Sequence, residues 1–148
     1  MSTTTRLATA ADIDAIEDLV RQYREELGYE GRRRIPVPDG PQGVFNVLLA
    51  ERDGEVVGML VLQRCHDLAR GTRFLLLSDI FVSPTGRRRG VARKLMHAVR
   101  DMAPELQCDG MSLMVSQVNV AALTTAAKAG FTSHDQLLFT YAEHSEDG

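Results

Sequence analysis

Three residues near the middle of the chain, Arg87, Gly90 and Ala92, have the types and spacing of a phosphate-binding turn. They follow an apolar segment typical of a buried strand and stand where an amphipathic helix is expected to begin. The first turn of a helix leaves N–H groups without internal partners, and the helix dipole adds positive potential there. Small residues let a ligand approach the backbone, and arginine adds charge-assisted hydrogen bonds. The segment therefore predicts a site for a phosphate or diphosphate group, although it matches neither the dinucleotide-binding fingerprint nor the P-loop.

The segment around this turn is basic in a chain that is otherwise acidic. Residues 80–100 contain no acidic residue and six positive ones, Arg87, Arg88, Arg89, Arg93, Lys94 and Arg100. The whole chain has a net charge of −3, so the remainder carries −9. A local basic island in an acidic protein favours one small anionic ligand over a long polyanion. The alternative from charge alone is a solvated helix face.

A second motif lies downstream and consists of Asn119, Ala122, Gly130 and Phe131. With both motifs, the chain resembles the GNAT superfamily of N-acetyltransferases, in which R/Q-x-x-G-x-G/A cradles the pyrophosphate of acetyl-CoA. The resemblance implies a single domain over residues 1–148. Its α+β fold would have a central mixed, mostly antiparallel, twisted sheet of six to seven strands with helices on both faces. It also implies an acetyl-CoA-dependent N-acetyltransferase whose acceptor is an amine on a small molecule, a peptide or a protein.

The chain departs from the family pattern at one position, where Ala126 replaces the expected tyrosine. In many family members that phenol protonates the departing thiolate. The identity of the general acid is therefore open. A second interpretation also remains, in which the chain is a non-catalytic acyl-CoA-binding module on the same fold.

The resemblance also implies how acetyl-CoA is held. Residues 87–92 would bind the pyrophosphate, and Arg93 and Lys94 would bind the 3′-phosphate of the adenosine. Main-chain groups of residues 80–82 would pair with the pantetheine arm as an added strand, beside a bulge that exposes one N–H. Asn119 would hydrogen-bond the same arm or cap a helix, or do both. The candidate cofactor-binding residues are Ile80, Phe81, Val82, Arg87, Arg88, Arg89, Gly90, Val91, Ala92, Arg93, Lys94 and Asn119.

Asp79 and Tyr141 are the candidate catalytic residues. Asp79 lies in the apolar segment 75–82, where burial disfavours the charged carboxylate and so makes it a better proton acceptor. An alkylammonium acceptor needs such a base near neutral pH. The structural alternative is that Asp79 pairs with Arg73 or caps a bulge.

Tyr141 is a candidate general acid, although an aromatic residue on a late strand is more often part of the core. Solvent or a hydroxyl group could also supply the proton, and the candidate hydroxyls are Ser78, Ser116 and Thr125. Neither Cys65 nor Cys108 has the basic surroundings of a reactive thiol. We therefore expect direct attack by the amine in a ternary complex rather than an acyl-cysteine intermediate.

The pattern of apolar residues and turn signals predicts the elements that position these groups. In chain order they are a strand at 4–8, a helix at 10–27 with a capping box at Thr9 and Asp12, strands at 46–52, 55–63 and 73–82, a helix from 90 that Pro104 ends, a strand at 111–116, a helix at 119–129 and closing strands at 131–133 and 136–143. The intervals 28–43, 65–72 and 133–136 are the expected acceptor-side loops.

Length and composition exclude several other classes. The 148 residues and 16.3 kDa correspond to one domain with its own core. The pI of about 5.8 argues against a general nucleic-acid-binding protein. No apolar segment approaches the length of a membrane span, no signal peptide is evident, and the cysteine and histidine spacings indicate no metal site. We expect a cytoplasmic enzyme without nucleic-acid or membrane partners, with a homodimer possible and a cationic acceptor favoured by the negative remainder of the chain.

Overall fold

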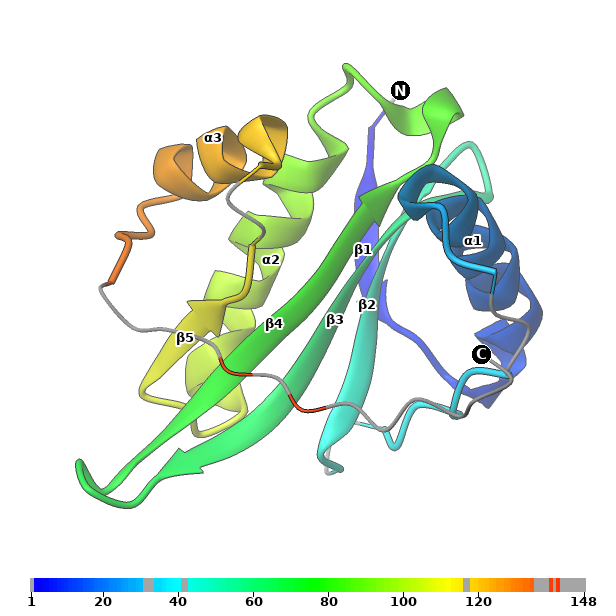
Figure 1. Ribbon diagram of the computed structural model, residues 1–148. Coiled ribbons are helices and arrows are strands. Elements are labelled where there is room, and N and C mark those ends of the chain that lie inside the picture. Colours follow the sequence, from blue (N-terminus) through cyan, green and yellow to red (C-terminus); the bar gives the residue numbers. More distant parts are fainter. Residues whose placement is uncertain are drawn as a thin grey trace.

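The computed structural model describes residues 2–30, 34–40, 43–115, 118–134, 139 and 141. These residues form one twisted sheet in the order β1-β2-β3-β4-β5, with α1 on one face and α2 on the other (Figure 1). The main elements are β1 (Thr4–Leu7), α1 (Ile13–Leu27), β2 (Phe45–Arg52), β3 (Glu55–Asp67), β4 (Thr72–Val82), α2 (Val91–Glu105), β5 (Gly110–Leu113) and α3 (Val120–Lys128). Short 3-10 turns, η1 (Ala10–Asp12) and η2 (Pro84–Gly86), precede α1 and α2. The first four strands are antiparallel and β5 joins β4 in parallel, which confirms the expected mixed sheet between helices.

Several expected elements differ from those in the structure, and the strand expected at 111–116 ends at Leu113. The strand expected at 131–133 is irregular chain, because the N–H of Phe131 donates to the carbonyl of Ala126 at 3.0 Å and stays bound to the end of α3. The described part of the sheet therefore has five strands rather than six or seven, and the strand expected at 136–143 lies almost entirely outside the described residues. Pro104 lies within the last turn of α2, which ends one residue later. β3 continues to Asp67, so the loop expected at 65–72 is only the short turn between β3 and β4.

One apolar cluster packs on each face of the sheet. Against α1, the cluster contains Ile16, Leu19, Val47, Leu49, Met59 and Phe81. Against α2, it contains Leu48, Leu60, Leu75, Leu77, Leu95 and Val99. Contact with α2 is close at Gly58, where a Cβ atom would lie 2.8 Å from Cγ1 of Val91. This position of β3 has no room for a side chain, so α2 is held directly against the sheet.

A β-bulge in β4 reverses which side chains face each helix. Val61 of β3 is opposite Asp79, but its neighbour Leu62 is opposite Leu77, so Ser78 has no partner in the register. Before the bulge, Leu77 packs into the α2 cluster; after it, Phe81 packs into the α1 cluster. An unbroken alternation would place Leu77, Asp79 and Phe81 on one face. The bulge instead turns Asp79 toward α1.

The far half of β4 has an open edge. β5 pairs only with residues 74–77 of β4, and the last bond between them runs from the N–H of Met114 to the carbonyl of Leu77 at 3.1 Å. Beyond this point the chain leaves the sheet toward α3 (Figure 1). Within the described ranges, no strand covers residues 78–82 on that side. The edge is free to pair with an extended ligand.

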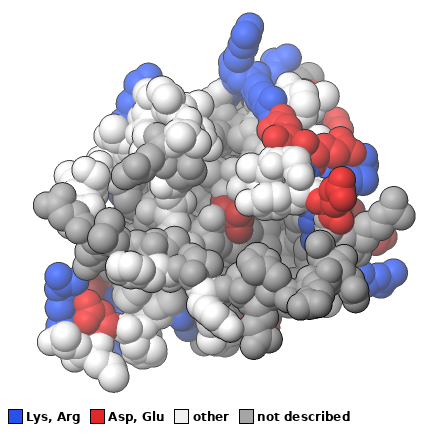
Figure 2. All heavy atoms as spheres, in the orientation of Figure 1, with Lys and Arg blue, Asp and Glu red and all other residues white. Residues whose placement is uncertain are grey.

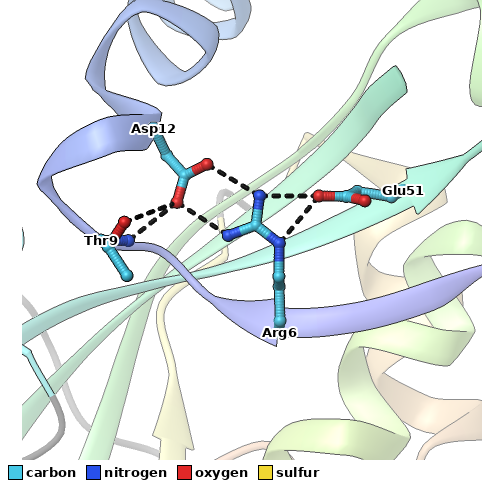
Figure 3. A network of polar contacts seen from close by, with 4 residues as sticks. All are labelled: Arg6, Thr9, Asp12 and Glu51. Carbon is cyan, nitrogen blue, oxygen red and sulfur yellow. Dashed lines mark hydrogen bonds and ion pairs between the residues drawn. The ribbon is translucent and has the colours of Figure 1, made fainter. Parts of the chain in front are cut away.

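An ion-pair network fixes the start of α1 to the sheet (Figure 3). Arg6 on β1 donates to both carboxylate oxygens of Asp12 at 2.7 Å and to Glu51 on β2 at 2.8 Å. The carboxylate of Asp12 also accepts from the N–H of Thr9 at 2.8 Å, which confirms the expected capping box. The guanidinium of Arg6 holds the pKa of Asp12 well below its ordinary value near 3.8.

We expect Asp12→Asn to lower the free energy of unfolding by about 1–2 kcal/mol at pH 7, as for loss of a cap and a charged hydrogen bond. A depressed carboxyl pKa stabilises the fold above the unfolded value, and this stabilisation is lost as the pH falls. The difference between wild type and variant should therefore shrink below about pH 4. Urea unfolding of both proteins from pH 7 to pH 3 measures it; a difference independent of pH would contradict this assignment.

Candidate active site

The N-terminus of α2 has no capping side chain. Gly90 is the N-cap residue, and the first bond within the helix runs from the N–H of Lys94 to the carbonyl of Gly90 at 2.9 Å. The N–H groups of Val91, Ala92 and Arg93 therefore have no acceptor within the helix. In contrast, α3 is capped by Asn119, whose Oδ1 accepts from the N–H of Ala122 at 3.1 Å. Of these two helices, α2 leaves its first N–H groups open to a ligand.

The turn that leads into α2 has an unusual backbone. Arg88 and Gly90 have positive φ values of 63° and 73°. A left-handed residue other than glycine costs about 1 kcal/mol or more, and such strain is found mainly where a site requires it. A Cβ atom placed on Gly90 would have nothing within 4 Å, so the space beside this residue is open. This open turn at a helix N-terminus fits a diphosphate.

Exposed cations surround the turn. The side chains of Arg88, Arg89, Arg93 and Lys94 are exposed, and none forms an ion pair with another described residue. These side chains are therefore accessible to an anion, and their role in binding phosphate stays a prediction.

Arg87 behaves differently from the other cations of the segment. Its guanidinium forms an ion pair with Glu26 on α1 and lies 5.7 Å from the ring centroid of Phe81. Its Nε also donates to the carbonyl of Val82 at 3.0 Å. The arginine of the motif thus connects α1 to the end of β4, a contact that its position in the sequence does not predict.

Main-chain groups alternate along the open edge of β4. The N–H of Ser83 donates to Val57 on β3 at 2.8 Å, so the neighbouring groups of Val82 point away from β3. By the same alternation, the N–H and carbonyl of Ile80 also face the open edge, whereas the backbone of Phe81 faces β3. Arg87 occupies the carbonyl of Val82. Among the described residues, the backbone groups of Ile80 and the N–H of Val82 have no strand partner on this side.

Asp79 has one hydrogen-bond donor and no cation partner among the described residues. The hydroxyl of Tyr23 on α1 donates to its Oδ1 at 3.1 Å. The expected alternative partner Arg73 contacts Gln107 instead, at 3.4 Å. A partly buried carboxylate without a compensating cation has the properties required of a proton acceptor.

Tyr23 lies on α1 and is not among the candidate residues predicted from the sequence. Its ring packs on Phe81 with centroids 5.2 Å apart. Burial, followed by the charge of Asp79, raises the pKa of Tyr23 to about 12, so the hydroxyl stays protonated and acts as a donor. The available signal was its residue type, because a tyrosine on a buried stripe needs a partner for its hydroxyl.

The structure gives less support to the remaining candidates. Tyr141 is 88% exposed, and its role as general acid stays a prediction. The hydroxyl of Thr125 donates to the carbonyl of Ala121 within α3 at 3.0 Å, and Ser116 lies outside the described residues. Burial raises the pKa of the Cys108 thiol, which disfavours the thiolate that an acyl-cysteine mechanism requires. In the described part of the chain, no three His, Cys, Asp or Glu side chains are grouped for a metal ion, and no helix is long and apolar enough to span a membrane.

Comparisons with known proteins agree with this geometry. Residues 13–131 match the model of the acetyltransferase (GNAT) family. The uncharacterized N-acetyltransferase YhfO of Bacillus subtilis (strain 168) is 26% identical over 135 residues, which cover 85% of this chain and 87% of that protein. Among solved structures, the ribosomal-protein-alanine N-acetyltransferase of Brucella melitensis biovar Abortus 2308 has a TM-score of 0.80 at 18% identity, covering 97% of this chain and 100% of that one. The aminoglycoside N-acetyltransferase AAC(6')-Iy in complex with CoA has a TM-score of 0.72 at 21% identity, covering 95% and 100%.

Proposed function

The chain belongs to the GNAT family of acetyltransferases, and we propose that its cofactor lies across the N-terminus of α2 and the open edge of β4. It is an N-acetyltransferase that transfers an acetyl group from acetyl-CoA to an amine. The observation that carries the proposed placement is the uncapped N-terminus of α2 directly after the unpaired end of β4. One feature binds a diphosphate and the other binds an extended chain, and acetyl-CoA contains both.

Each part of this surface has a separate task. The N–H groups of residues 91–93 bind the diphosphate, and Arg93 and Lys94 bind the 3′-phosphate. Ile80 and the N–H of Val82 hold the pantetheine arm by main-chain hydrogen bonds. Acetyl-CoA supplies an acetyl group activated as a thioester. The bulge at Ser78 lies where the covered half of β4 meets its open half. This position supports the proposal that Asp79 lies beside the transferred group.

Asp79 accepts the proton that an ammonium acceptor must lose before it can react. In the transfer, the N–H bond of the acceptor breaks and an O–H bond forms on the Asp79 carboxylate. The freed amine forms the N–C bond as the C–S bond breaks, and the second proton that the nitrogen must lose to become an amide is released to solvent. The thiolate leaves with its electron pair and takes a proton from solvent or from Tyr141. No acyl-enzyme is needed, so both substrates are bound together.

The charge of the molecule favours a cationic amine as acceptor. Setting the basic segment 80–100 aside, the chain carries a net −9, and Figure 2 shows acidic side chains gathered on the α1 side of the face. Such a field raises the local concentration of cations and repels anions. The two enzymes of known structure are named for different acceptors, a ribosomal-protein alanine and aminoglycosides. The fold alone therefore does not determine which amine is acetylated.

A thermal-shift series followed by an amine panel tests the proposed function. We expect acetyl-CoA and CoA to stabilise the protein, by about 2.7 kcal/mol at 100 times the dissociation constant. Dephospho-CoA should stabilise less, because Arg93 and Lys94 lose their phosphate.

Thiol release should then be measured with an aminoglycoside, a polyamine and a peptide with N-terminal alanine. Turnover should be fastest with a multiply charged amine. Stabilisation by CoA without turnover of any amine would favour the binding-module interpretation; equal stabilisation by CoA and dephospho-CoA would contradict the assigned phosphate contacts.

A further inference from the structure

A chain of contacts connects α1 to the proposed base. The hydroxyl of Tyr23 donates to Asp79, and the Tyr23 ring packs on Phe81. Phe81 in turn lies beneath the guanidinium of Arg87, which is paired with Glu26. Glu26 is three residues after Tyr23, so both extend from the same side of α1. The Tyr23 ring is thus held between a helix and a strand end, in one orientation.

We propose that Tyr23 is a positioning residue for acetyl transfer, which orients the Asp79 carboxylate so that its Oδ2 faces the acceptor amine. The inference rests on the proposed role of Asp79 as proton acceptor. No described residue donates to Oδ2, so this atom remains free for the substrate once Tyr23 has fixed Oδ1. A carboxylate with one fixed oxygen loses its rotational freedom before the substrate arrives, which reduces the cost of reaching the reactive geometry.

Tyr23 acts as a donor and does not carry the transferred proton. Its raised pKa, about 12, keeps the hydroxyl protonated at any pH where an acetyltransferase is assayed. The proton removed from the amine therefore resides on Asp79, while Tyr23 retains its own.

Few other charged or titratable groups among the described residues lie near Tyr23 and Asp79. From α1, the titratable groups near it are Tyr23 and Glu26, followed by Tyr29 just after the helix, which raises the pKa of Tyr23 slightly through its charge. From the turn before α2 the charged group is Arg87, and β3 contributes only Val61, opposite Asp79. Glu26 and Arg87 are paired with each other, so the carboxylate that loses a hydrogen-bond donor when the Tyr23 hydroxyl is removed is Asp79.

The test is Tyr23→Phe, which removes the hydroxyl and keeps the ring on Phe81. At saturating acetyl-CoA we expect kcat to fall about 10-fold, as for loss of a hydrogen bond to a charged group, with KM for acetyl-CoA unchanged. The rising limb of kcat against pH should also move to higher pH. Removing a hydrogen-bond donor from a carboxylate disfavours its charged form relative to its neutral form.

Thr3→Val is the matched control, because it removes a hydroxyl that accepts a 2.8 Å bond from Arg52 away from the site. It should reproduce any small loss of thermal stability and leave kcat and the pH profile unaltered. A purely structural role for Tyr23 would make the two variants alike in kinetics, and that result would overturn the inference.

Combination with Asp79→Asn separates the inference from the proposed function. If Tyr23 acts through Asp79, the double variant should be no slower than Asp79→Asn alone. Multiplication of the two losses would overturn the positioning role and leave Asp79 as base. Full activity of Asp79→Asn would instead overturn the proposed base, and the positioning role with it.

Discussion

Gly90→Val should abolish the thermal stabilisation of the protein by acetyl-CoA, and we expect it to lower the affinity at least about 100-fold, equivalent to about 2.7 kcal/mol. Gly90 has φ 73°, and a β-branched residue is severely disfavoured in this left-handed conformation. Its side chain would also extend into the open space where we place the diphosphate. Both effects disturb the N–H groups at the start of α2. Isothermal titration and thermal shifts with acetyl-CoA measure the loss.

Gly54→Val provides a closely matched control. Gly54 lies in the turn between β2 and β3, has φ 76°, and likewise has nothing within 4 Å of a built Cβ atom. Both variants should lose comparable stability in the absence of ligand. Only the Gly54 variant should keep its response to acetyl-CoA. A normal response from the Gly90 variant would remove the diphosphate from the N-terminus of α2.

Asp79→Asn should lower kcat about 10²–10³-fold, within the range for loss of a general base, and leave acetyl-CoA binding unchanged. Asparagine can still accept the hydrogen bond from Tyr23 but cannot take up a proton. An alkylamine loses its own proton near pH 10, so the deficit should shrink as the assay pH approaches that value. Rates measured from pH 6 to pH 10 test this dependence.

Asp109→Asn is the control for this change of an acid to its amide. Asp109 accepts a 3.0 Å bond from the backbone N–H of Arg73, at the opposite end of β4. Its activity should match that of the wild type at every pH. A pH-independent deficit in the Asp79 variant would contradict the role as base, because a misfolded site does not recover as the amine deprotonates.

The raised pKa of Tyr23 predicts how the stability of the protein changes at alkaline pH. A tyrosine whose pKa is raised on folding stabilises the protein fully below the unfolded value of about 10. Between pH 10 and pH 12 the unfolded chain loses this proton and the folded chain keeps it, so stability falls. Tyr23→Phe should lose less stability over this interval than the wild type, as measured by urea unfolding; parallel losses would contradict the cited shift.

The parts of the site that depend on local chain geometry could be predicted from the sequence. The apolar segment before Val82, the small residues at Gly90 and Ala92, and the amphipathic stripe after them define a strand, a turn and a helix N-terminus. Each depends on neighbours within a few residues, and such signals are strong. Asn119 was expected as a possible N-cap for the same reason, and it caps α3.

The contacts between distant segments could not be predicted in this way. Nothing near Tyr23 in the chain indicates that its hydroxyl meets Asp79, 56 residues away. Arg87 appeared to belong with the other free cations, but tertiary contacts with Glu26 and Val82 occupy its side chain. Such partners are set by how α1 packs on the sheet, which charge and spacing along one segment do not encode.

Because Ser78 is an extra, unpaired residue in β4, deleting a residue here would have a larger effect on the strand than substituting one. Side chains of other types at Ser78 preserve the count, and with it the outward or inward direction of everything that follows. Deletion of a single residue there would exchange the two sides of the strand end, so that Ile80 and Val82 would trade places with Asp79 and Phe81. In a lineage of such proteins, point changes at this position would be tolerated, whereas a one-codon gap would eliminate both the hydrophobic packing and the chemistry in one event.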